Sequence, residues 1–534
     1  AAAWVVVSNM LAAIVPVALG LVAPPSNTLI VGAGPAGLST AIALARRGYK
    51  NIEVVDRLPP PPALDDTDTW SDTARFYLIG IGGRGQKALR KIGAWDALEP
   101  FTQEVRGRKD WAPGAGVDGG VLTVRADRPP LNVIQRDRLV ACLLRLATEE
   151  CGVRVRHELD VTAVRWEGSD AILSCRPCGD ECQLEDSAEG ASEEVELVAA
   201  GGGGAGGSGN GGGGFELRAP LLVASDGVRR TVGEAIEAED AARRWVFPGR
   251  RFRVIKYPDA SERVYKTVPF KPPPAWRGDI NYSARTAAAN FDALPALDGN
   301  YCGVLLIKPD DELTRGLPDV PAARKYFDDL LPMFSPHITN EAIQTVLDKP
   351  TSRLPQFRYA GPRLHHAGNT ALLGDAIHSV KPYFGLGVNS AFEDVAALGE
   401  ALDTAPSLDA ALRQFSFKRA SEARVLVQIS RSFDLGGWRS FAFFIGPRNR
   451  CVAPTIRHVA LGQLSATWPS ASVALPRGPR PTIRHVAIGT RCSATCPSAG
   501  PSVGHCKLGH LLRCAPATTA STAASLPPPP LRPC

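Results

Sequence analysis

The hydrophobic and polar positions between residues 28 and 166 repeat a simple order of elements. Residues 28–57 hold an apolar run, a glycine-rich turn, an Ala/Leu-rich segment and a second apolar run. This order predicts a strand, a tight turn, a helix and a strand. The periodicity of residues 84–98 predicts a helix. Residues 131–152 predict a strand that runs into an amphipathic helix, and residues 153–166 alternate as strands do.

The second half of the chain changes character at about residue 245. Residues 245–310 contain many strand-like runs, which predict a separate antiparallel sheet, and residues 321–348 look helical. Residues 370–402 predict a strand, a loop and a helix, and a further helix follows through residues 413–433. The fold class is therefore α/β, with a strand–turn–helix–strand unit over 28–57 and a separate antiparallel sheet.

Two regions interrupt these patterns. Residues 175–214 are polar and acidic and then almost pure glycine, which predicts a disordered insert in a surface hairpin loop, where added length costs little. Residues 450–534 carry two imperfect copies of a Pro-punctuated sequence that begin at residues 454 and 481. Two copies are too few for a solenoid, so we expect a disordered, low-complexity tail.

The domain boundaries follow from these shifts. We expect an apolar N-terminal segment over 1–26, a discontinuous dinucleotide-binding domain over 28–240 and 350–435, and a substrate-binding sheet domain over 241–349.

The segment 1–26 is uncharged and about as long as a bilayer requires, roughly 20 residues. It predicts either a membrane anchor or the remnant of a targeting segment, and a truncated start is the alternative. An intracellular location follows, with the mitochondrion, the chloroplast or a membrane surface left open.

Composition and charge change the picture little. Hydrophobic content of 44% and charged content of 21% are typical of a globular enzyme. The net charge is +6, but the residues from Cys451 onward hold eight Lys and Arg and no acidic residue, which leaves −2 for the rest. The basic surplus belongs to the tail and gives no indication of a nucleic-acid partner.

The glycine-rich turn carries the first chemistry. Gly32, Gly34 and Gly37 match G-x-G-x-x-G between a predicted strand and helix, where the helix N-terminus attracts a pyrophosphate. Asp56, followed by Arg57, ends the second strand, where a carboxylate binds ribose hydroxyls. These residues indicate a dinucleotide site without separating FAD from NAD.

Two later motifs make that separation. Asp226 and Gly227 end one apolar strand, and Gly374 and Asp375 end another. A loop with Pro382, Gly385, Gly387 and Asn389 follows the second strand. In this order the motifs resemble the single-component FAD-dependent aromatic hydroxylases.

The resemblance implies a Rossmann-like FAD-binding domain with an interleaved antiparallel-sheet substrate domain, and it implies roles for these residues. In that family the Gly-Asp aspartate binds the ribityl chain, the Pro/Gly-rich loop lies along the isoalloxazine, and the following helix points its N-terminus at the flavin. A helix dipole in that place stabilises an anionic reduced flavin.

Within that group the chain is most similar to the kynurenine 3-monooxygenases, from about residue 28 to about residue 435. Residues 74–89 resemble that family's segment with two arginines, here Arg75 and Arg84. Residues 133–139 resemble its Arg-Asp-Arg-Leu, which places Arg136 on the flavin-contacting arginine, and residues 293–309 resemble its substrate sheet.

The chain also departs from the family. The Asp-Gly motif usually continues to a Ser and then to an Arg, and here those positions hold Arg230 and Gly233. Leu386 and Val388 stand where the family usually has Gln and Met. The family's pocket tyrosine should fall in residues 112–129, which contain no aromatic residue.

The predicted function is FAD-dependent hydroxylation of a small aromatic substrate, with NAD(P)H as a transient co-substrate and O₂ activated as a flavin C4a-hydroperoxide. The alternatives are an epoxidase or reductase of a lipid-like isoprenoid or quinone precursor, and a degenerate flavin-binding protein. Arg84 is either a carboxylate-binding residue or a structural arginine.

We expect no metal site and assign no certain catalytic residue. The candidate substrate-binding residues are Arg84, Phe384 and Asn389. The candidate cofactor-binding residues are Gly32, Gly34, Gly37, Asp56, Arg57, Arg75, Arg136, Asp226, Gly227, Gly374, Asp375, Pro382, Gly385 and Gly387.

Overall fold

The computed structural model describes residues 22–71, 77–124, 126–178, 214–243, 251–259, 262–382 and 385–434. The chain divides into two compact units, 1–467 and 468–534, and all of the described residues belong to the first. Most of the predicted N-terminal segment, most of the predicted insert and the whole predicted tail lie outside the described residues.

A six-stranded sheet forms the centre of the dinucleotide-binding part. Its order is β20-β21-β12-β1-β2-β8, and every neighbouring pair is parallel except β20 with β21. Its strands are β1 (Thr28–Val31), β2 (Ile52–Val55), β8 (Arg154–Arg156), β12 (Leu222–Ala224), β20 (His365–His366) and β21 (Thr370–Leu372). The strand–turn–helix–strand predicted over 28–57 is present as β1, α2 (Pro35–Ala45) and β2. Because parallel strands end at one edge, β1, β12 and β21 deliver their following loops to the same place.

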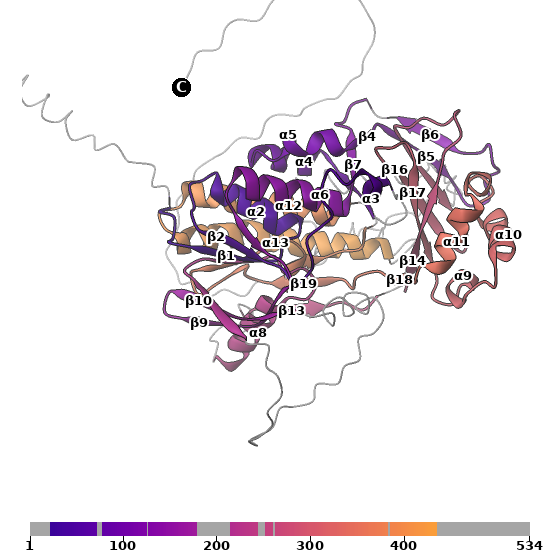
Figure 1. Cartoon of the computed structure of the whole chain (residues 1–534). Coiled ribbons are helices and arrows are strands. Elements are labelled where there is room, and N and C mark those ends of the chain that lie inside the picture. Colours follow the sequence, from indigo (N-terminus) through magenta and orange to yellow (C-terminus); the bar gives the residue numbers. More distant parts are fainter. Residues whose placement is uncertain are drawn as a thin grey trace, which may run out of the picture. The chain divides into compact units, whose positions relative to one another are not determined.

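A seven-stranded sheet forms the second layer, in the order β18-β14-β17-β16-β15-β5-β6. Its strands are β5 (Gly107–Trp111), β6 (Val121–Val124), β14 (Val264–Phe270), β15 (Ile280–Arg285), β16 (Asn290–Pro295), β17 (Tyr301–Ile307) and β18 (Ser352–Arg353). Four strands come from the predicted substrate domain, 241–349. Figure 1 shows the helices α9, α10 and α11 gathered beside this sheet.

The edge of the seven-stranded sheet crosses the predicted domain boundary. β5 and β6 lie within residues that the sequence assigned to the cofactor domain, yet β5 pairs in parallel with β15, with Lys109 opposite Tyr282. The two segments are far apart in the sequence, so no local pattern could show that they pair. Strand β13 (Arg253–Lys256), in contrast, leaves this sheet and pairs with β19 (Arg358–Gly361).

Three smaller sheets complete the strands. Their orders are β11-β10-β9, β13-β19-β22 and β3-β7-β4. The remaining strands are β3 (Leu78–Ile81), β4 (Gln103–Val105), β7 (Leu131–Gln135), β9 (Leu159–Glu167), β10 (Asp170–Pro177), β11 (Phe215–Ala219) and β22 (His378–Ser379). In the first of these sheets β10 and β11 pair antiparallel, with Cys175 opposite Phe215. The undescribed residues 179–213 therefore connect two hairpin partners, as expected for an insert in a hairpin loop.

The helices follow the predicted segments with local breaks. Besides α2 they are α3 (Thr67–Ser71), α4 (Gly83–Lys91), α5 (Trp95–Leu98), α6 (Arg136–Arg145), α8 (Thr231–Ala242), α9 (Glu312–Arg315), α10 (Val320–Leu330), α11 (Asn340–Asp348), α12 (Leu386–Thr404) and α13 (Leu408–Asp434). Short 3₁₀ turns cover Glu99–Phe101, Ser335–His337 and Gly374–Ala376, and a π turn covers Leu146–Glu150. The single helix predicted over 84–98 is divided into α4 and α5, because Gly93 adopts a φ of 70° between them.

Two hydrophobic cores hold the layers. One contains Ile30, Val54 and Leu398, which lie on the six-stranded sheet and its helices. The other contains Phe270, Phe291 and Phe334, which fill the space between the seven-stranded sheet and α10 and α11. Each part thus has a core of its own, and the residues between the two cores are free to line a site.

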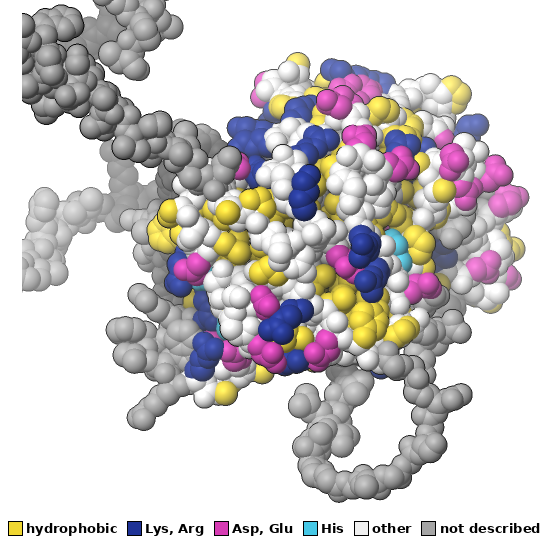
Figure 2. All heavy atoms as spheres, turned by 60° about the vertical axis from the view of Figure 1, so that its left-hand side comes forward, with side chains coloured by type: hydrophobic (Ala, Val, Ile, Leu, Met, Phe, Trp, Pro, Cys, Tyr) yellow, Lys and Arg dark blue, Asp and Glu magenta, His cyan; other side chains and the backbone are white. Residues whose placement is uncertain are grey.

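The exterior carries charges of both signs. On the face drawn in Figure 2, Lys and Arg side chains lie among Asp and Glu side chains rather than forming one basic area. Within the described residues, no helix is long and apolar enough to cross a membrane.

Candidate active site

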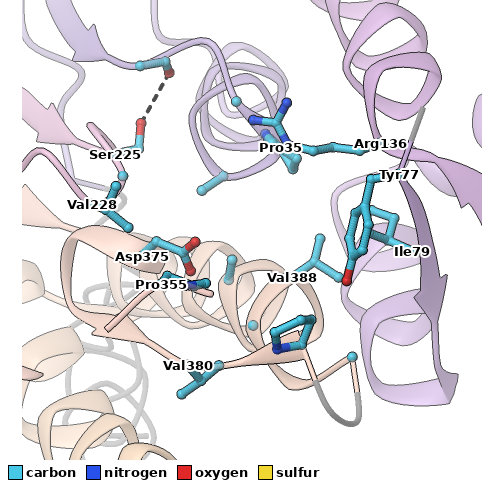
Figure 3. Close-up of a pocket in the computed structure, with 18 of the residues that line it drawn as sticks. Pro35, Tyr77, Ile79, Arg136, Ser225, Val228, Pro355, Asp375, Val380 and Val388 are labelled. Atoms are coloured by element: carbon cyan, nitrogen blue, oxygen red, sulfur yellow. Dashed lines mark hydrogen bonds between the residues drawn. The ribbon is translucent and has the colours of Figure 1, made fainter. Parts of the chain in front are cut away.

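One cavity of about 690 Å³ connects the two layers. Its lining includes Gly32 after β1, Asp226 after β12, and Asp375 after β21. Figure 3 shows Pro35, Arg136 and Asp375 around this space, with the Asp375 carboxylate directed into it. The three strand ends singled out in the sequence therefore open into the same cavity, and its size is ordinary for a site that binds an organic ligand.

The glycine turn is shaped by backbone contacts. A Cβ on Gly32, whose φ is 100°, would lie 2.3 Å from the carbonyl oxygen of Ser225, and one on Gly37 would lie 1.8 Å from the carbonyl oxygen of Gly32. The Ser225 hydroxyl donates to the carbonyl oxygen of Val31 at 2.8 Å, which fastens β12 to the turn (Figure 3). Gly34 is different, because a Cβ there would meet nothing within 4 Å and would project into an open space beside the N-terminus of α2.

Asp56 braces the same turn. Its Oδ2 accepts a hydrogen bond from the backbone N–H of Ala33 at 2.5 Å, and its Oδ1 accepts one from Leu58 at 2.8 Å. Asp56 and Arg57 both line the cavity. Each carboxylate oxygen of Asp56 keeps lone-pair capacity for a further donor.

The carboxyl groups of Asp226 and Asp375 are largely removed from solvent. Burial raises the pKa of Asp226 to about 6, against hydrogen bonds that lower it. Burial also raises the pKa of Asp375, although His378, Arg230 and Arg136 oppose the shift. Asp226 Oδ2 accepts from the Val232 N–H at 3.1 Å, while its Oδ1 is buried without a hydrogen-bond partner among the described residues. That oxygen is an acceptor that a ligand hydroxyl would satisfy.

Arg230 connects the two motifs. It is 1% exposed and has a φ of 57°. Its guanidinium donates to the carbonyl oxygens of Ala376 (3.1 Å) and Asp375 (2.5 Å) and to the Ser379 hydroxyl (2.7 Å). Burial lowers the pKa of Arg230 to about 10, so it remains charged at neutral pH. A Cβ on Gly233 would have its nearest neighbour, the Cβ of Arg230, at 3.6 Å. The arginine expected at 233 is therefore replaced by one that reaches the Asp375 loop from 230.

The loop before α12 forms another wall. Pro382, Gly385, Gly387 and Val388 line the cavity, and Gly385 is the residue before the helix, with a φ of 59°. Below this loop, a buried network joins Asp394 to His378 Nε2 (2.9 Å) and to Arg419 Nε (2.7 Å). His378 is thus a buried member of this network and lies outside the cavity lining.

The far end of the cavity meets the seven-stranded sheet. Tyr77 and Val388 both line the cavity (Figure 3). Burial raises the pKa of Tyr77 well above its usual range. The apolar residues of this end are Leu294, Val304, Leu306, Leu354, Pro355 and Val380. The polar residues on the sheet are Arg108, Tyr265, Asn281, Arg285 and Asp292.

Two predicted substrate residues are corrected by the structure. Arg84 lies outside the cavity lining, and its NH1 pairs with Glu393 Oε2 at 3.3 Å. The Asn389 amide donates to the carbonyl oxygens of Gly80 (3.0 Å) and Gly385 (2.6 Å) and accepts from the Gly82 N–H (2.9 Å). The Arg84 charge is compensated locally, and the Asn389 side chain is used to join α12 to the turn after β3.

The other predicted residues divide into three groups. Gly32, Gly34, Asp56, Arg57, Arg136, Asp226, Gly227, Asp375, Pro382, Gly385 and Gly387 line the cavity. Gly37 and Gly374 stand behind it and allow close packing, because a Cβ on Gly374 would lie 3.0 Å from the Ala36 Cβ. Arg75 and Phe384 lie outside the described residues.

The sequence did not identify the polar residues of the seven-stranded sheet that line the cavity. It also did not identify Ile79 on β3 or Tyr77, the residue before β3. Along β16 the burial alternates, with Phe291 and Ala293 buried and Asp292 and Leu294 half-buried toward the cavity. The alternation of apolar and polar residues is visible in the sequence. Which face of β16 lines the cavity depends on how the strand packs in the folded protein.

Comparison with known proteins agrees with this geometry. A family model described as an FAD binding domain matches residues 337–429, which contain Asp375 and α12, and one described as an NAD(P)-binding Rossmann-like domain matches residues 30–61. Kynurenine 3-monooxygenase of Salinispora arenicola is 25% identical over 411 residues, which cover 76% of this chain and 78% of that protein. Violacein synthase of Chromobacterium violaceum is 25% identical over 442 residues, covering 79% and 88%. Over about three quarters of its length this chain is therefore similar to FAD-dependent monooxygenases.

Solved structures of other proteins share the fold of this chain. Klebsiella pneumoniae HpxO, complexed with FAD and uric acid, superposes with a TM-score of 0.55 at 18% identity, covering 83% of this chain and 97% of that one. A mutant of 2-methyl-3-hydroxypyridine-5-carboxylic acid oxygenase gives 0.55 at 17% identity, covering 79% and 96%.

The residues of this chain fit an FAD molecule. The open space at Gly34, the N-terminus of α2 and the unsatisfied Oδ1 of Asp226 are the features that a diphosphate and a polyhydroxyl chain require. Within the described residues, the one glycine-rich Rossmann turn, Gly32–Gly37, would bind the diphosphate of one dinucleotide.

Proposed function

We propose that this protein hydroxylates a small aromatic substrate, using O₂ and electrons from NAD(P)H. The observation that carries the proposal is the single cavity that runs from the Gly32 turn, past Asp226 and Asp375, to the seven-stranded sheet. The bound flavin supplies the reduction and activation of O₂, and the chain supplies binding, orientation and a dry pocket.

Each part of the cavity has a task in this scheme. The N-terminus of α2 binds the diphosphate, Asp56 the ribose, and Asp226 and Asp375 the remaining hydroxyls. The N-terminus of α12, after Gly385, would offer its partial positive charge to the negative charge of a reduced flavin.

The substrate lies between this loop and the seven-stranded sheet. The apolar side chains of Leu294, Val304, Leu306 and Leu354 exclude water from it. Similar proteins support an aromatic substrate, since the structures of HpxO and of Pseudomonas aeruginosa PqsL contain uric acid and 2-aminobenzoylacetate.

The test is NAD(P)H oxidation by the FAD-loaded protein with kynurenine, other amino- and hydroxy-aromatic acids, and a panel of isoprenoids and quinones. We expect one of the aromatic compounds to accelerate oxidation and to gain one oxygen atom from ¹⁸O₂. Acceleration by the lipid compounds alone would contradict the proposal.

A further inference from the structure

The seven-stranded sheet presents a charged wall to an otherwise apolar end of the cavity. Arg108 on β5, Asn281 and Arg285 on β15, and Asp292 on β16 all line it. On β16 Asp292 stands next in line to Leu294, on the face that turns away from the aromatic core. Placing a charged group among apolar neighbours costs free energy unless it is compensated.

Only one carboxylate oxygen of Asp292 accepts hydrogen bonds from the described residues. Its Oδ1 accepts from the Ser283 hydroxyl at 2.7 Å and from the Arg285 guanidinium at 2.9 Å. Its other oxygen has no hydrogen bond from any described residue, and the side chain is 35% exposed although it lies within the cavity. Arg285 and Ser283 lower the pKa of Asp292 against the effect of burial, so it is ionised at neutral pH.

We propose that Asp292 is the residue that selects the substrate, by accepting a hydrogen bond from an amino or hydroxyl group on its aromatic ring. This inference rests on the proposed function and names the substrate class. Arg285 and Ser283 hold Oδ1 and thereby leave the second oxygen directed at the ligand. A merely structural ion pair would not need an acceptor exposed to the cavity.

The chemistry agrees with this role. A ring hydroxyl or amino group that donates to a carboxylate gains electron density, and this density reaches the ring positions next to it and opposite to it. An electron-rich ring carbon accepts an electrophilic oxygen atom more readily. Asp292 is therefore expected to favour amino- and hydroxy-arenes over rings without a donor, and no proton has to leave the substrate.

The experiment compares D292N with the wild type and with D279N. Asp279 is a matched control, because it pairs with Arg277 Nε at 2.9 Å just before β15, the strand that carries Arg285, but lies outside the cavity lining. The probes are 2-aminobenzoate, 2-hydroxybenzoate and benzoate, and the readout is their dissociation constant from the FAD-loaded protein by calorimetry.

We expect the wild type and D279N to bind at least one of the two donor-bearing probes about tenfold more tightly than benzoate. In D292N this preference should fall to within about twofold. D292S is measured in parallel in case D292N does not fold, and thermal unfolding identifies which variants are native.

Two results overturn the inference: no preference in the wild type, or a preference that folded D292N and D292S retain. Failure of the proposed function looks different. In that case the preference exists and depends on Asp292, but no aromatic compound accelerates NAD(P)H oxidation.

Discussion

At the scale of single residues, the cofactor end of the cavity holds acidic groups in unfavourable surroundings. Asp226 has one oxygen bound to the N–H of Val232 and one buried without a partner among the described residues. Such groups lower the free energy of unfolding of the apoprotein, and they can accept hydrogen bonds from a ligand rich in hydroxyl groups. The sequence identified Asp226 and Asp375 from their motifs, but not the desolvation that gives them this character.

The raised pKa of Asp226 predicts a pH dependence. Its folded pKa is about 6 and its ordinary value is 3.8, so the folded apoprotein holds the proton more tightly than the unfolded chain. The group therefore makes stability fall as pH rises between these values, and the penalty is complete above them. D226N should raise the apoprotein's free energy of unfolding by on the order of 1–2 kcal/mol at pH 8, and by less at pH 5.

Urea denaturation of both apoproteins at several pH values from 5 to 8 measures this difference. A gain that is the same at every pH would show that the amide acts through packing and not through titration.

Arg230 gives a second prediction at this scale. R230M should remove the charged hydrogen bonds to the 375–379 loop and destabilise the apoprotein by at least about 2 kcal/mol. R243M is the control, because Arg243 pairs with Glu239 on the exposed surface of α8. In the double variant R230S/G233R we expect part of the loss to be restored, since a Cβ at 233 would meet its nearest neighbours at ordinary van der Waals distances, from 3.6 Å. Thermal unfolding measures all three, and equal effects of R230M and R243M would contradict the assigned role.

At the scale of elements, the glycine turn needs Gly37 for packing of the backbone and Gly34 for space beside the ligand. G37A places a Cβ 1.8 Å from the Gly32 carbonyl oxygen, which the backbone cannot accommodate, so the folded protein should be lost or strongly destabilised. G34A places its Cβ in open space. Its apoprotein should melt within about 2 °C of the wild type, while its affinity for FAD falls at least about tenfold, since the new methyl group occupies the path of the diphosphate.

Differential scanning fluorimetry and FAD titration provide the two readouts for this pair. If G34A bound FAD as the wild type does, the diphosphate would not lie on this turn.

Elements differ in how well the sequence predicts them. The run over 28–57 was predicted because strand, turn, helix and strand each carry a strong local pattern. The helix over 84–98 was predicted as one element, and Gly93 divides it. The edge strands β5 and β6 were assigned to the wrong domain, because the pairing of Lys109 with Tyr282 joins residues far apart in the sequence.

The same limit explains the site. Motif residues such as Gly32 and Asp375 were recognisable because they precede or follow a strand in a fixed order. Asp292 was not, because only the register of β16 against β15 and β17 turns it toward the cavity. For Arg84 the sequence left a carboxylate-binding and a structural role open, because its partner Glu393 lies on α12, far along the chain.

At the scale of the whole molecule, two separately packed cores leave one continuous cavity between a cofactor layer and a substrate layer. The central claim is that one FAD molecule touches the Gly32 turn, Asp226 and Asp375 at the same time. Calorimetric titration of the apoprotein with FAD tests it most directly. We predict one FAD per chain, an affinity that G34A, D226N and D375N each lower, and no displacement by NADP⁺. Displacement of FAD by NADP⁺, or an affinity for FAD that none of the three substitutions changes, would contradict the claim.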